Sequence, residues 1–476
     1  HYALDITDTS DSSSYVCERT LRQYRAWMVE SGADQILFRS LTDKLINVFQ
    51  VQTGKQRLDS THLLSDMRKM RRLDLLRSTI KKFLRELRRA HPQIFTKSIE
   101  EELRERYLPD KKNGCFSRVS PEEAQLRLQA VAEDMLRLAE QFRDHACVRE
   151  LESFKLLLRV LEEQCEVVEG ETEKTVVLKD PKTISAASVQ NPHDPEAGYD
   201  GHKGQGYQAQ IQETYHEKTE DEKKAPQLDL IVYAEVESAS ASDGDALMPA
   251  IEDTQERGCS PQEVLADASY GSDENVEKAA AEGVDVTSPT KGKPQSKERM
   301  LILDDFVIDE ESGNITQCPA GEAPQEIREG KKGKRTVCFD AEVCANCEYR
   351  EYCCVGLDEK HTLSYTPKQG RLAQRRSNED TAEFKEKYKY RSGIEATNSH
   401  LKRDLKMKRL RVRGLAKVRY VVLLKITGMN LMRAARFQKA RLLPDFHFWM
   451  HPIAWYYRRV FPILSMSGNI LTVPAS

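Results

Sequence analysis

The sequence predicts an α/β fold, a mixed sheet flanked by helices, and three observations lead to that prediction. Short strand-like and helix-like stretches alternate between residues 206 and 290, which is typical of strands and helices layered around one core. Residues 66–165 have long stretches with helical periodicity. Residues 291–380 are rich in lysine, glycine and cysteine. We therefore expect the sheet to carry a large helical insertion and a small cysteine-rich insertion.

These patterns divide the 476-residue chain into seven parts, a size that fits several domains or one domain with insertions. The expected parts are an N-terminal helical region that has lost its beginning (1–50), the first core strand (51–65), a helical insertion and linker (66–205), the sheet core (206–290), the cysteine-rich insertion (291–380), a second helical region (381–441) and a C-terminal tail (442–476).

The N-terminal part is expected to contain two helices and a strand. Apolar side chains recur three and four residues apart in 20–28 and in 41–49, which favours helices. The segment 55–64 is short and follows Gly54, so we expect a strand there, and this strand carries Asp59.

The insertion begins with an apolar stripe that has arginines and lysines opposite it, which predicts an amphipathic helix. The stripe consists of Met67, Met70, Leu73, Leu76, Ile80, Leu84 and Leu87. Two further helices are expected at 121–143 and 148–165. Residues 170–206 contain Pro, Gly, Asp and Asn, and we expect irregular chain there.

The sheet core alternates between the two kinds of element. The expected elements are a strand at 206–215, a strand at 228–236, a helix at 245–257 that ends at Gly258, a strand at 263–271 that runs into a turn, a helix that Ser272 caps and that stops at Gly283, and a strand at 284–289.

The composition excludes a membrane protein. No run of 18 apolar residues occurs, and 31% of the residues are charged. No cationic start followed by an apolar segment is visible, so we expect reduced thiols and a cytoplasmic, nucleoid-associated protein.

The net charge of −3 hides a segregation of charge. Residues 213–285 hold 20 acidic and 5 basic side chains, whereas 385–441 hold 18 basic and 3 acidic ones. A second basic run spans 68–89. Two basic blocks in a nearly neutral chain indicate a polyanion partner, although each block alone is equally well explained as a solvated helix face.

Two aspartates belong to expected strands, one at the end of its strand and one inside it. Asp267 ends an apolar strand immediately before a turn, where open α/β sheets bind ligands, although Asp is also common in turns. Asp59 lies inside a strand, where Asp is disfavoured. A metal ion or a local turn would each account for Asp59.

A polar stripe marks the second helical region. Tyr388, Arg391, Glu395, Asn398 and Lys402 are spaced three, four, three and four residues apart, which places them on one helix face. An ordinary surface ladder of ion pairs has the same spacing. The position of Glu395 favours function, because an acid in a phosphate-binding segment repels DNA unless a divalent cation lies between them.

The chain resembles bacterial insertion-sequence transposases with an RNase H-like DDE catalytic domain. Three blocks carry the resemblance, over about residues 15–440: Gln56-Arg-Leu-Asp-Ser-Thr-His, Leu265-Ala-Asp-Ala-Ser-Tyr-Gly-Ser, and Tyr388-x2-Arg391-x3-Glu395-x6-Lys402, which fits the YREK signature of one large transposase group. The first block is the weakest, because Asp194 and Asp200 compete with Asp59. We prefer Asp59, because only it has a strand around it.

The resemblance implies an RNase H-like sheet and a metal-dependent enzyme that cleaves DNA at element ends and transfers strands into target DNA. Asp59, Asp267 and Glu395 would bind two Mg²⁺ (or Mn²⁺) ions. The phosphate-binding side chains would be Tyr388, Arg391, Lys402, Arg403 and Lys406. The implied partners are the terminal inverted repeats, target DNA and a second copy of the chain in a homodimer on DNA.

The cysteines cluster late in the chain. Six of the 11 lie between Cys318 and Cys354, and Cys344 with Cys347 forms a CxxC pair. With Cys353 and Cys318 this spacing predicts a structural zinc site, although free thiols in an insertion are an alternative. Cys338 and Cys354 are the remaining candidates. Related transposases often carry such an insert, which favours zinc.

Two other functions stay open on the sequence alone. One is a nuclease of the same fold that no longer transposes. The other is an inactive or truncated DNA-binding regulator, which a missing N-terminal block favours and three intact carboxylates oppose.

Overall fold

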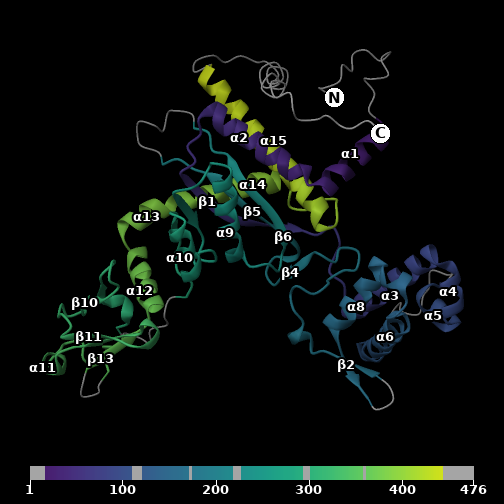
Figure 1. The fold of residues 1–476 in the computed structure, drawn as a ribbon, viewed down its shortest axis with the longest axis horizontal. Helices are drawn as coiled ribbons and strands as arrows, with labels where there is room; N and C mark the ends of the chain where they lie inside the picture. The colour runs from purple at the N-terminus through teal and green to yellow at the C-terminus, as the bar shows by residue number, and fades with distance from the viewer. Residues whose placement is uncertain are drawn as a thin grey trace.

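The computed structural model describes residues 17–109, 121–170, 174–217, 227–292, 301–356 and 361–442. A six-stranded mixed sheet lies at its centre (Figure 1). The strands are β1 (Lys55–Leu64), β4 (Gly198–Asp200), β5 (Gly204–Thr214), β6 (Ile231–Ser238), β7 (Glu263–Ala266) and β8 (Asp285–Thr287). All the strands expected from the sequence for the sheet are present.

The first strand lies in the middle of the sheet. β1 pairs with antiparallel β5 on one side and with parallel β7 on the other, with β6 beyond β5 and β8 beyond β7. This order is consistent with an RNase H-like fold. Leu58 pairs with both Gln212 and Ala266. Because side chains alternate along strands, Asp59 faces the side of the sheet opposite to Leu58.

Helices cover both faces of the sheet. The face of Leu58 packs against α9 (Leu247–Glu256) and α10 (Asp273–Ala281) in one apolar cluster. The opposite face lies under α14 (Gly393–Arg403) and α15 (Leu415–Leu442). The N-terminal helices are α1 (Glu18–Ser31) and α2 (Ala33–Phe49), and α2 runs beside α15 (Figure 1).

The long helix α15 is fixed to the sheet by a buried amide. Asn430 accepts a hydrogen bond from the Ile231 backbone N–H at 3.0 Å and donates one to the Ile231 carbonyl at 2.8 Å. It also lies 3.2 Å from the Thr42 hydroxyl of α2. These bonds satisfy a backbone group at the start of the edge strand β6 and set the position of α15 along the sheet.

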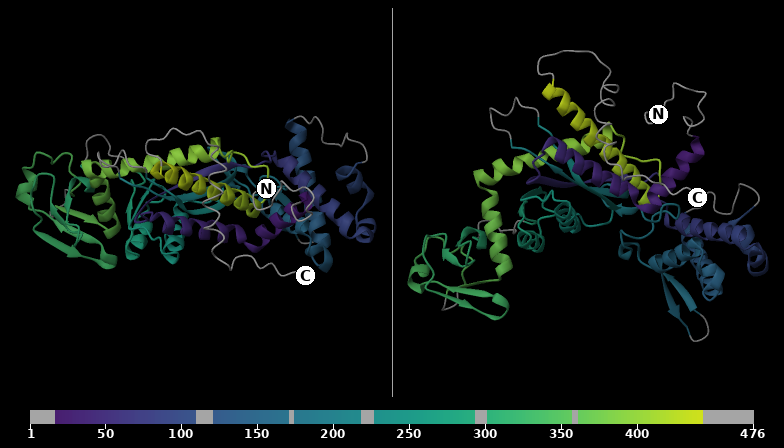
Figure 2. Two further views of the ribbon diagram at one scale, coloured as in Figure 1. Left: turned by 90° about the horizontal axis from the view of Figure 1, so that it is seen from above. Right: turned by 45° about the horizontal axis from the view of Figure 1, so that its top comes forward.

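The helical insertion follows β1 and lies at one end of the molecule (Figure 1, Figure 2). Its helices are α3 (Arg72–Ala90), α4 (Pro92–Ser98), α5 (Glu101–Tyr107), α6 (Pro121–Phe142), α7 (Ala146–Arg149) and α8 (Glu152–Gln164). They enclose an apolar core centred on the fully buried rings of Phe83, Phe142 and Phe154. The predicted helices are confirmed.

The expectation of irregular chain over 170–206 is wrong in part. A hairpin of β2 (Cys165–Glu169) and β3 (Lys174–Leu178) follows α8, and β4 and the start of β5 also lie in this stretch. The hairpin buries Cys165 and Val176 against the insertion core. Each strand contains two adjacent valines, and this β-branched content outweighs the surrounding turn-forming residues.

The cysteine-rich region lies at the opposite end of the molecule (Figure 2). Its elements are β9 (Val307–Ile308), β10 (Ile315–Gln317), β11 (Glu326–Glu329), β12 (Arg335–Cys338), α11 (Ala341–Ala345), β13 (Thr362–Tyr365) and α12 (Pro367–Glu379). Phe306, Val337 and Tyr365 form a small apolar core. The helix α12 was not expected; Thr366 begins it with a capping box to Gln369.

The second helical region differs from one uninterrupted helix. It consists of α13 (Ala382–Tyr388), a 3-10 turn at Lys389–Ser392, α14, a non-helical segment over 404–414, and α15. The expected tail beyond residue 442 and the first 16 residues lie outside the described part of the chain. Among the helices that are described, none has the length and apolar composition needed to cross a bilayer.

Candidate active site

Two of the predicted carboxylates lie on neighbouring strands of the sheet. Asp59 and Asp267 each directly follow a residue of the parallel pair Leu58 and Ala266. Adjacent strands are about 4.8 Å apart, and residues that share a register point to the same face. The sheet therefore presents both carboxylates toward α14.

The turn after β7 holds Asp267 in place. Its side chain accepts a hydrogen bond from the Ser269 backbone N–H at 2.7 Å, and its carbonyl accepts one from Tyr270 at 3.2 Å. The buried Tyr270 hydroxyl donates to Gln210 of β5 at 2.5 Å. Gly271 follows because a Cβ there would lie 1.7 Å from the Ser288 hydroxyl. The turn thus fixes the position of the Asp267 carboxylate, so the turn interpretation and the ligand-site interpretation of this residue are compatible.

Glu395 reaches the site from the first turn of α14. Arg391 donates to Glu395 Oε1 at 2.8 Å and to Asp59 Oδ1 at 3.1 Å, so one guanidinium joins the two carboxylates. Asn398 donates to Asp59 Oδ2 at 3.0 Å. The Asp59 side chain is 13% exposed and that of Glu395 is 61% exposed. The polar stripe of the sequence therefore faces Asp59, although Tyr388 ends α13 and Arg391 lies in the 3-10 turn before α14.

The charges in the site influence one another. Burial raises the pKa of the Asp59 carboxyl, the Arg391 guanidinium opposes that rise, and the Asp267 carboxylate adds to it. Burial also raises the pKa of Tyr388, with Arg391 opposing the rise and the three carboxylates adding to it. Tyr388 and Arg391 thus lie close to all three acids.

The predicted phosphate-binding residues fall into two groups. Lys402 and Arg403 line a groove of about 550 Å³ together with Asp59, Glu395 and other side chains. Burial lowers the pKa of Lys402, and the nearby Lys203 lowers it further. Lys406 is exposed in the segment after α14 and does not line this groove.

The two competing aspartates have structural roles. Asp194 is fully buried and accepts hydrogen bonds from the Tyr207 hydroxyl at 2.6 Å, the Gly414 backbone N–H at 2.9 Å and the Ser65 hydroxyl. Asp200 accepts from the backbone N–H groups of residues 202 and 203 in a turn. Neither shares a register position with Asp267.

A buried ion-pair network beneath α14 was missed by the sequence analysis. Glu213 of β5 is fully buried and accepts from Arg57 at 2.7 Å, from Arg433 at 2.9 Å and from Thr397 of α14 at 2.8 Å. Arg433 belongs to α15, so the network connects two strands with two helices. A charged residue in each of two central strands was the available signal, because such residues are rarely buried without partners.

Arg57 also determines where α14 begins. Its guanidinium donates to the Tyr390 carbonyl at 2.8 Å, in the turn that precedes the helix. At Gly393, the first residue of α14, a Cβ would lie 2.0 Å from Arg57 Nη1. Any larger residue would displace Arg57 or move the helix that carries Glu395. Arg57 is therefore a positioning residue for the site.

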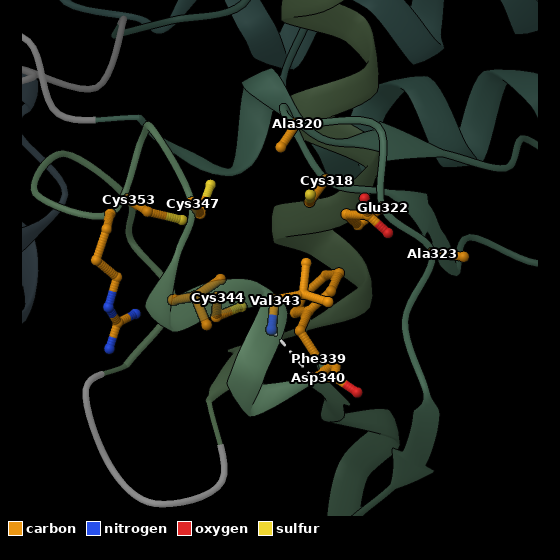
Figure 3. A pocket seen from close by; sticks show the side chains of 12 residues that line it. Cys318, Ala320, Glu322, Ala323, Phe339, Asp340, Val343, Cys344, Cys347 and Cys353 are labelled. Carbon is orange, nitrogen blue, oxygen red and sulfur yellow. Dashed lines mark hydrogen bonds between the residues drawn. The ribbon is translucent and has the colours of Figure 1, made fainter.

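The four cysteines predicted to bind zinc border one cavity, at the far end of the molecule from the helical insertion. Cys318, Cys344, Cys347 and Cys353 line it from three different segments (Figure 3). All ten cysteines in the described residues are free. Within those residues, neither these thiols nor the three carboxylates form a group of three or more His, Cys, Asp or Glu arranged to hold a metal ion.

Comparison with known proteins gives a match to a family model. No curated protein and no solved structure matches the chain. Residues 317–435 match the family model of a transposase DDE domain. The matched range contains Glu395 and all six clustered cysteines and ends within α15, whereas Asp59 and Asp267 precede it. Such domains act on DNA with divalent metal ions, Mg²⁺ or Mn²⁺. The match is confined to this range of the chain, and it supports a function in transposition.

Proposed function

We propose that this chain is a DNA transposase that cuts DNA at the terminal inverted repeats of its element and joins the freed 3′ ends to target DNA. One observation carries the proposal. Two carboxylates from adjacent parallel strands lie beneath a third on α14, in a chain whose residues 317–435 match a transposase DDE domain.

The donor atoms suit a divalent metal. Asp59, Asp267 and Glu395 offer carboxylate oxygens, the ligands that Mg²⁺ and Mn²⁺ prefer. Arg391 now joins Asp59 and Glu395, and it must give up its bond to Glu395 before all three acids can bind cations. The exposure of Glu395 leaves room for this change. Bound ions would activate the attacking oxygen and stabilise the leaving oxygen.

The other side chains of the site position the DNA. Asn398 holds Asp59 in its orientation through a hydrogen bond of 3.0 Å. Lys402 and Arg403 line the groove beside the acids and are placed to bind phosphate oxygens. Tyr388 and Arg391 interact electrostatically with all three acids and are placed to contact phosphate beside them. We propose that Lys406 contacts phosphates further from the reacting bond.

The test is cleavage of DNA that carries the inverted repeats, with purified protein and Mg²⁺. We expect nicks at the repeat ends, joining of those ends to a second DNA, and loss of both activities with a chelator. Asp267→Asn keeps the size of the side chain and should abolish cleavage, whereas Asp285→Asn, an exposed acid on β8, should not. Cleavage in the presence of chelator would overturn the proposal.

We also propose that the cysteine-rich region binds one structural zinc through Cys318, Cys344, Cys347 and Cys353. The support is that these four thiols border one cavity in a region with a small apolar core. Elemental analysis of the purified chain should find about one zinc per chain, and its removal should lower the melting temperature. Zinc-free protein with an unchanged melting temperature would contradict the site.

Transposition joins two element ends, so we propose that two copies of the chain act together on DNA, in the cytoplasm and at the nucleoid. Sedimentation of the protein with and without inverted-repeat DNA measures this directly. A complex that holds one chain per two ends would contradict it.

A further inference from the structure

A basic segment leads away from the candidate active site along the edge of the sheet. We call residues 403–413, which are the last residue of α14 and the non-helical stretch that follows it, the basic ribbon. Its apolar members turn inward and its charged members turn outward. The inward side chains are Leu405, Met407, Leu410 and Val412, and the exposed cations are Arg403, Lys406, Lys408, Arg409, Arg411 and Arg413.

The ribbon is held in place near its middle and at its end. Near its middle, the Leu64 backbone N–H donates to the Lys408 carbonyl at 2.9 Å, so the segment lies against the end of β1. Lys408 also lines the groove that contains Asp59. At its end, the backbone N–H of Gly414 donates to the buried Asp194 at 2.9 Å. The ribbon therefore has a defined path that begins in the candidate active site.

The far end of the ribbon meets the helical insertion. Lys82 of α3 donates to the Pro192 carbonyl at 2.6 Å, two residues before the aspartate that holds Gly414. Burial lowers the pKa of the intervening His193, and the charges of Lys82, Arg413 and Arg85 lower it further. Cations of the ribbon and of α3 thus lie around one short loop.

The helix α3 continues the line of positive charge. Lys81, Arg85 and Arg88 are spaced four and three residues apart on it, so they lie on one helix face. Burial lowers the pKa of Lys81, and the charges of Arg85 and Arg77 lower it further. Such a row of like charges is unfavourable in the free protein and becomes favourable when it binds a polyanion.

Within the described residues, the cations of this path other than Arg403 have no carboxylate partner, unlike most basic residues of α4 to α8. Among the described residues, Arg85, Arg411 and Arg413 form no ion pair, whereas Arg137 of α6 and Arg143, just after α6, pair with Glu100 and Glu140. The acids near the path are engaged already. Asp404 pairs with Arg403, Glu196 accepts from the Leu415 backbone, and Asp200 accepts from its own turn.

We propose that the basic ribbon and the Lys81–Arg85–Arg88 face of α3 form one continuous track for the phosphate backbone of duplex DNA, leading from the candidate active site to the helical insertion. The proposal rests on the proposed function only in taking DNA as the partner at the site. The helical insertion is then a second DNA-binding arm, which holds the duplex that flanks the cleavage point.

The test measures the salt dependence of binding to fluorescent duplexes of random sequence, one of about 10 and one of about 40 base pairs, that is, about one and four helical turns. One variant is Arg411→Ala with Arg413→Ala, and a second is Arg85→Ala with Arg88→Ala. The matched control is Arg137→Ala with Arg143→Ala, which removes the same charge from the insertion but away from the track.

On the long duplex, each track variant should reduce the slope of log K against log salt by about 1.8, because each lost phosphate contact contributes about 0.9. The two reductions should add in the fourfold variant. On the short duplex, which cannot span both parts, they should not add. The control should keep the wild-type slope on both.

The outcomes separate the track from the proposed function. If both track variants keep the wild-type slope while the wild-type protein binds and cleaves DNA, the track is rejected and the proposed function stands. An effect of only one track variant on the long duplex overturns its continuity. Wild-type protein that binds neither duplex overturns the proposed function together with the track. Melting temperatures of the variants, whose replaced side chains are exposed, verify that they fold.

Discussion

The helical insertion and the site face of the sheet, which is the face that carries Asp59 and lies under α14, are stabilised in different ways. The insertion surrounds fully buried rings, with Phe83 lying 5.7 Å from Phe142 and 5.3 Å from Phe154 between ring centroids. The site face instead places Asp59 and Glu213 beneath α14. Apolar packing has no preferred direction, whereas hydrogen-bonded ion pairs fix the orientation of the helix they hold. The molecule thus uses directional contacts where the position of Glu395 matters.

The largest expected effect separates activity from stability. Glu395→Gln should lower the rate of strand cleavage at least about 100-fold, because it removes a charged ligand from the site. Its melting temperature should remain that of the wild type, since the side chain is 61% exposed. Single-turnover cleavage and thermal unfolding measure the two quantities. Binding of DNA should survive, because a charge that repels phosphate is removed.

The insertion provides the opposite control. Phe83→Ala should lower the free energy of unfolding by about 3–5 kcal/mol, since it opens a cavity in the apolar core. At a temperature where it stays folded, it should still cleave DNA. If Glu395→Gln cleaves as fast as the wild type, the catalytic interpretation of α14 fails.

The second prediction concerns the buried ion pairs. Glu213→Ala leaves Arg57 and Arg433 without their carboxylate and should cost about 3–5 kcal/mol of stability. The cleavage rate of the folded fraction should also fall, because Thr397 and the start of α14 lose their support. Denaturant unfolding and single-turnover cleavage, measured on the same preparation, test both effects.

A comparable buried pair in the insertion is the control. Asp134 is 5% exposed and accepts from Arg106 and from the Tyr107 hydroxyl at 2.6 Å. Asp134→Ala should lower stability by a similar amount and leave cleavage by the folded protein unchanged. If both variants lose cleavage equally, the network beneath α14 has no special role in positioning it.

The contrast between the two regions also explains what the sequence could predict. Apolar periodicity is a local signal, so α3 was predicted from it within a few residues, and β1 was predicted from its short length after Gly54. The place of Asp267 at the end of a strand was predicted because the strand and its turn are adjacent in sequence. The partnership of Arg57 with Glu213 was not found, because 156 residues separate them and nothing local marks which strands pair. The break between Tyr388 and α14 was also missed, because a 3-10 turn preserves helical spacing over four residues.

A smaller effect follows from the charge of Asp59. Its pKa is raised by burial, with Arg391 opposing and Asp267 adding to the rise, so the native state loses stability as pH increases through that raised pKa. Asp59→Asn removes this loss and should melt a few degrees higher than the wild type at pH near 7.

The gain should disappear at low pH. The ordinary pKa of Asp is about 3.9. Below that pH the wild-type carboxyl is protonated in both the folded and the unfolded protein, so the two melting temperatures should converge. Glu383→Gln, an exposed acid on α13, is the control and should show no such gain. A lower melting temperature for Asp59→Asn at neutral pH would mean that the bonds to Arg391 and Asn398 outweigh the cost of burial.

The smallest expected effect lies at the edge of the site face, where an ion pair is partly exposed. There the difference in stabilisation between the two regions should disappear. Lys387 of α13 binds Glu263 at 2.9 Å and Asp285 at 2.7 Å, and its side chain is 27% exposed. Water screens such pairs, so Lys387→Ala should cost no more than about 1 kcal/mol, and less at high salt. The control is Lys385→Ala on the same helix, whose side chain is 62% exposed and lies 3.9 Å from Asp380, and it should change the free energy of unfolding by almost nothing. Denaturant titrations at low and high salt measure both variants. A loss for Lys387→Ala as large as that for Glu213→Ala, and independent of salt, would mean that the attachment of α13 to β7 and β8 is as important for the fold as the buried network beneath α14.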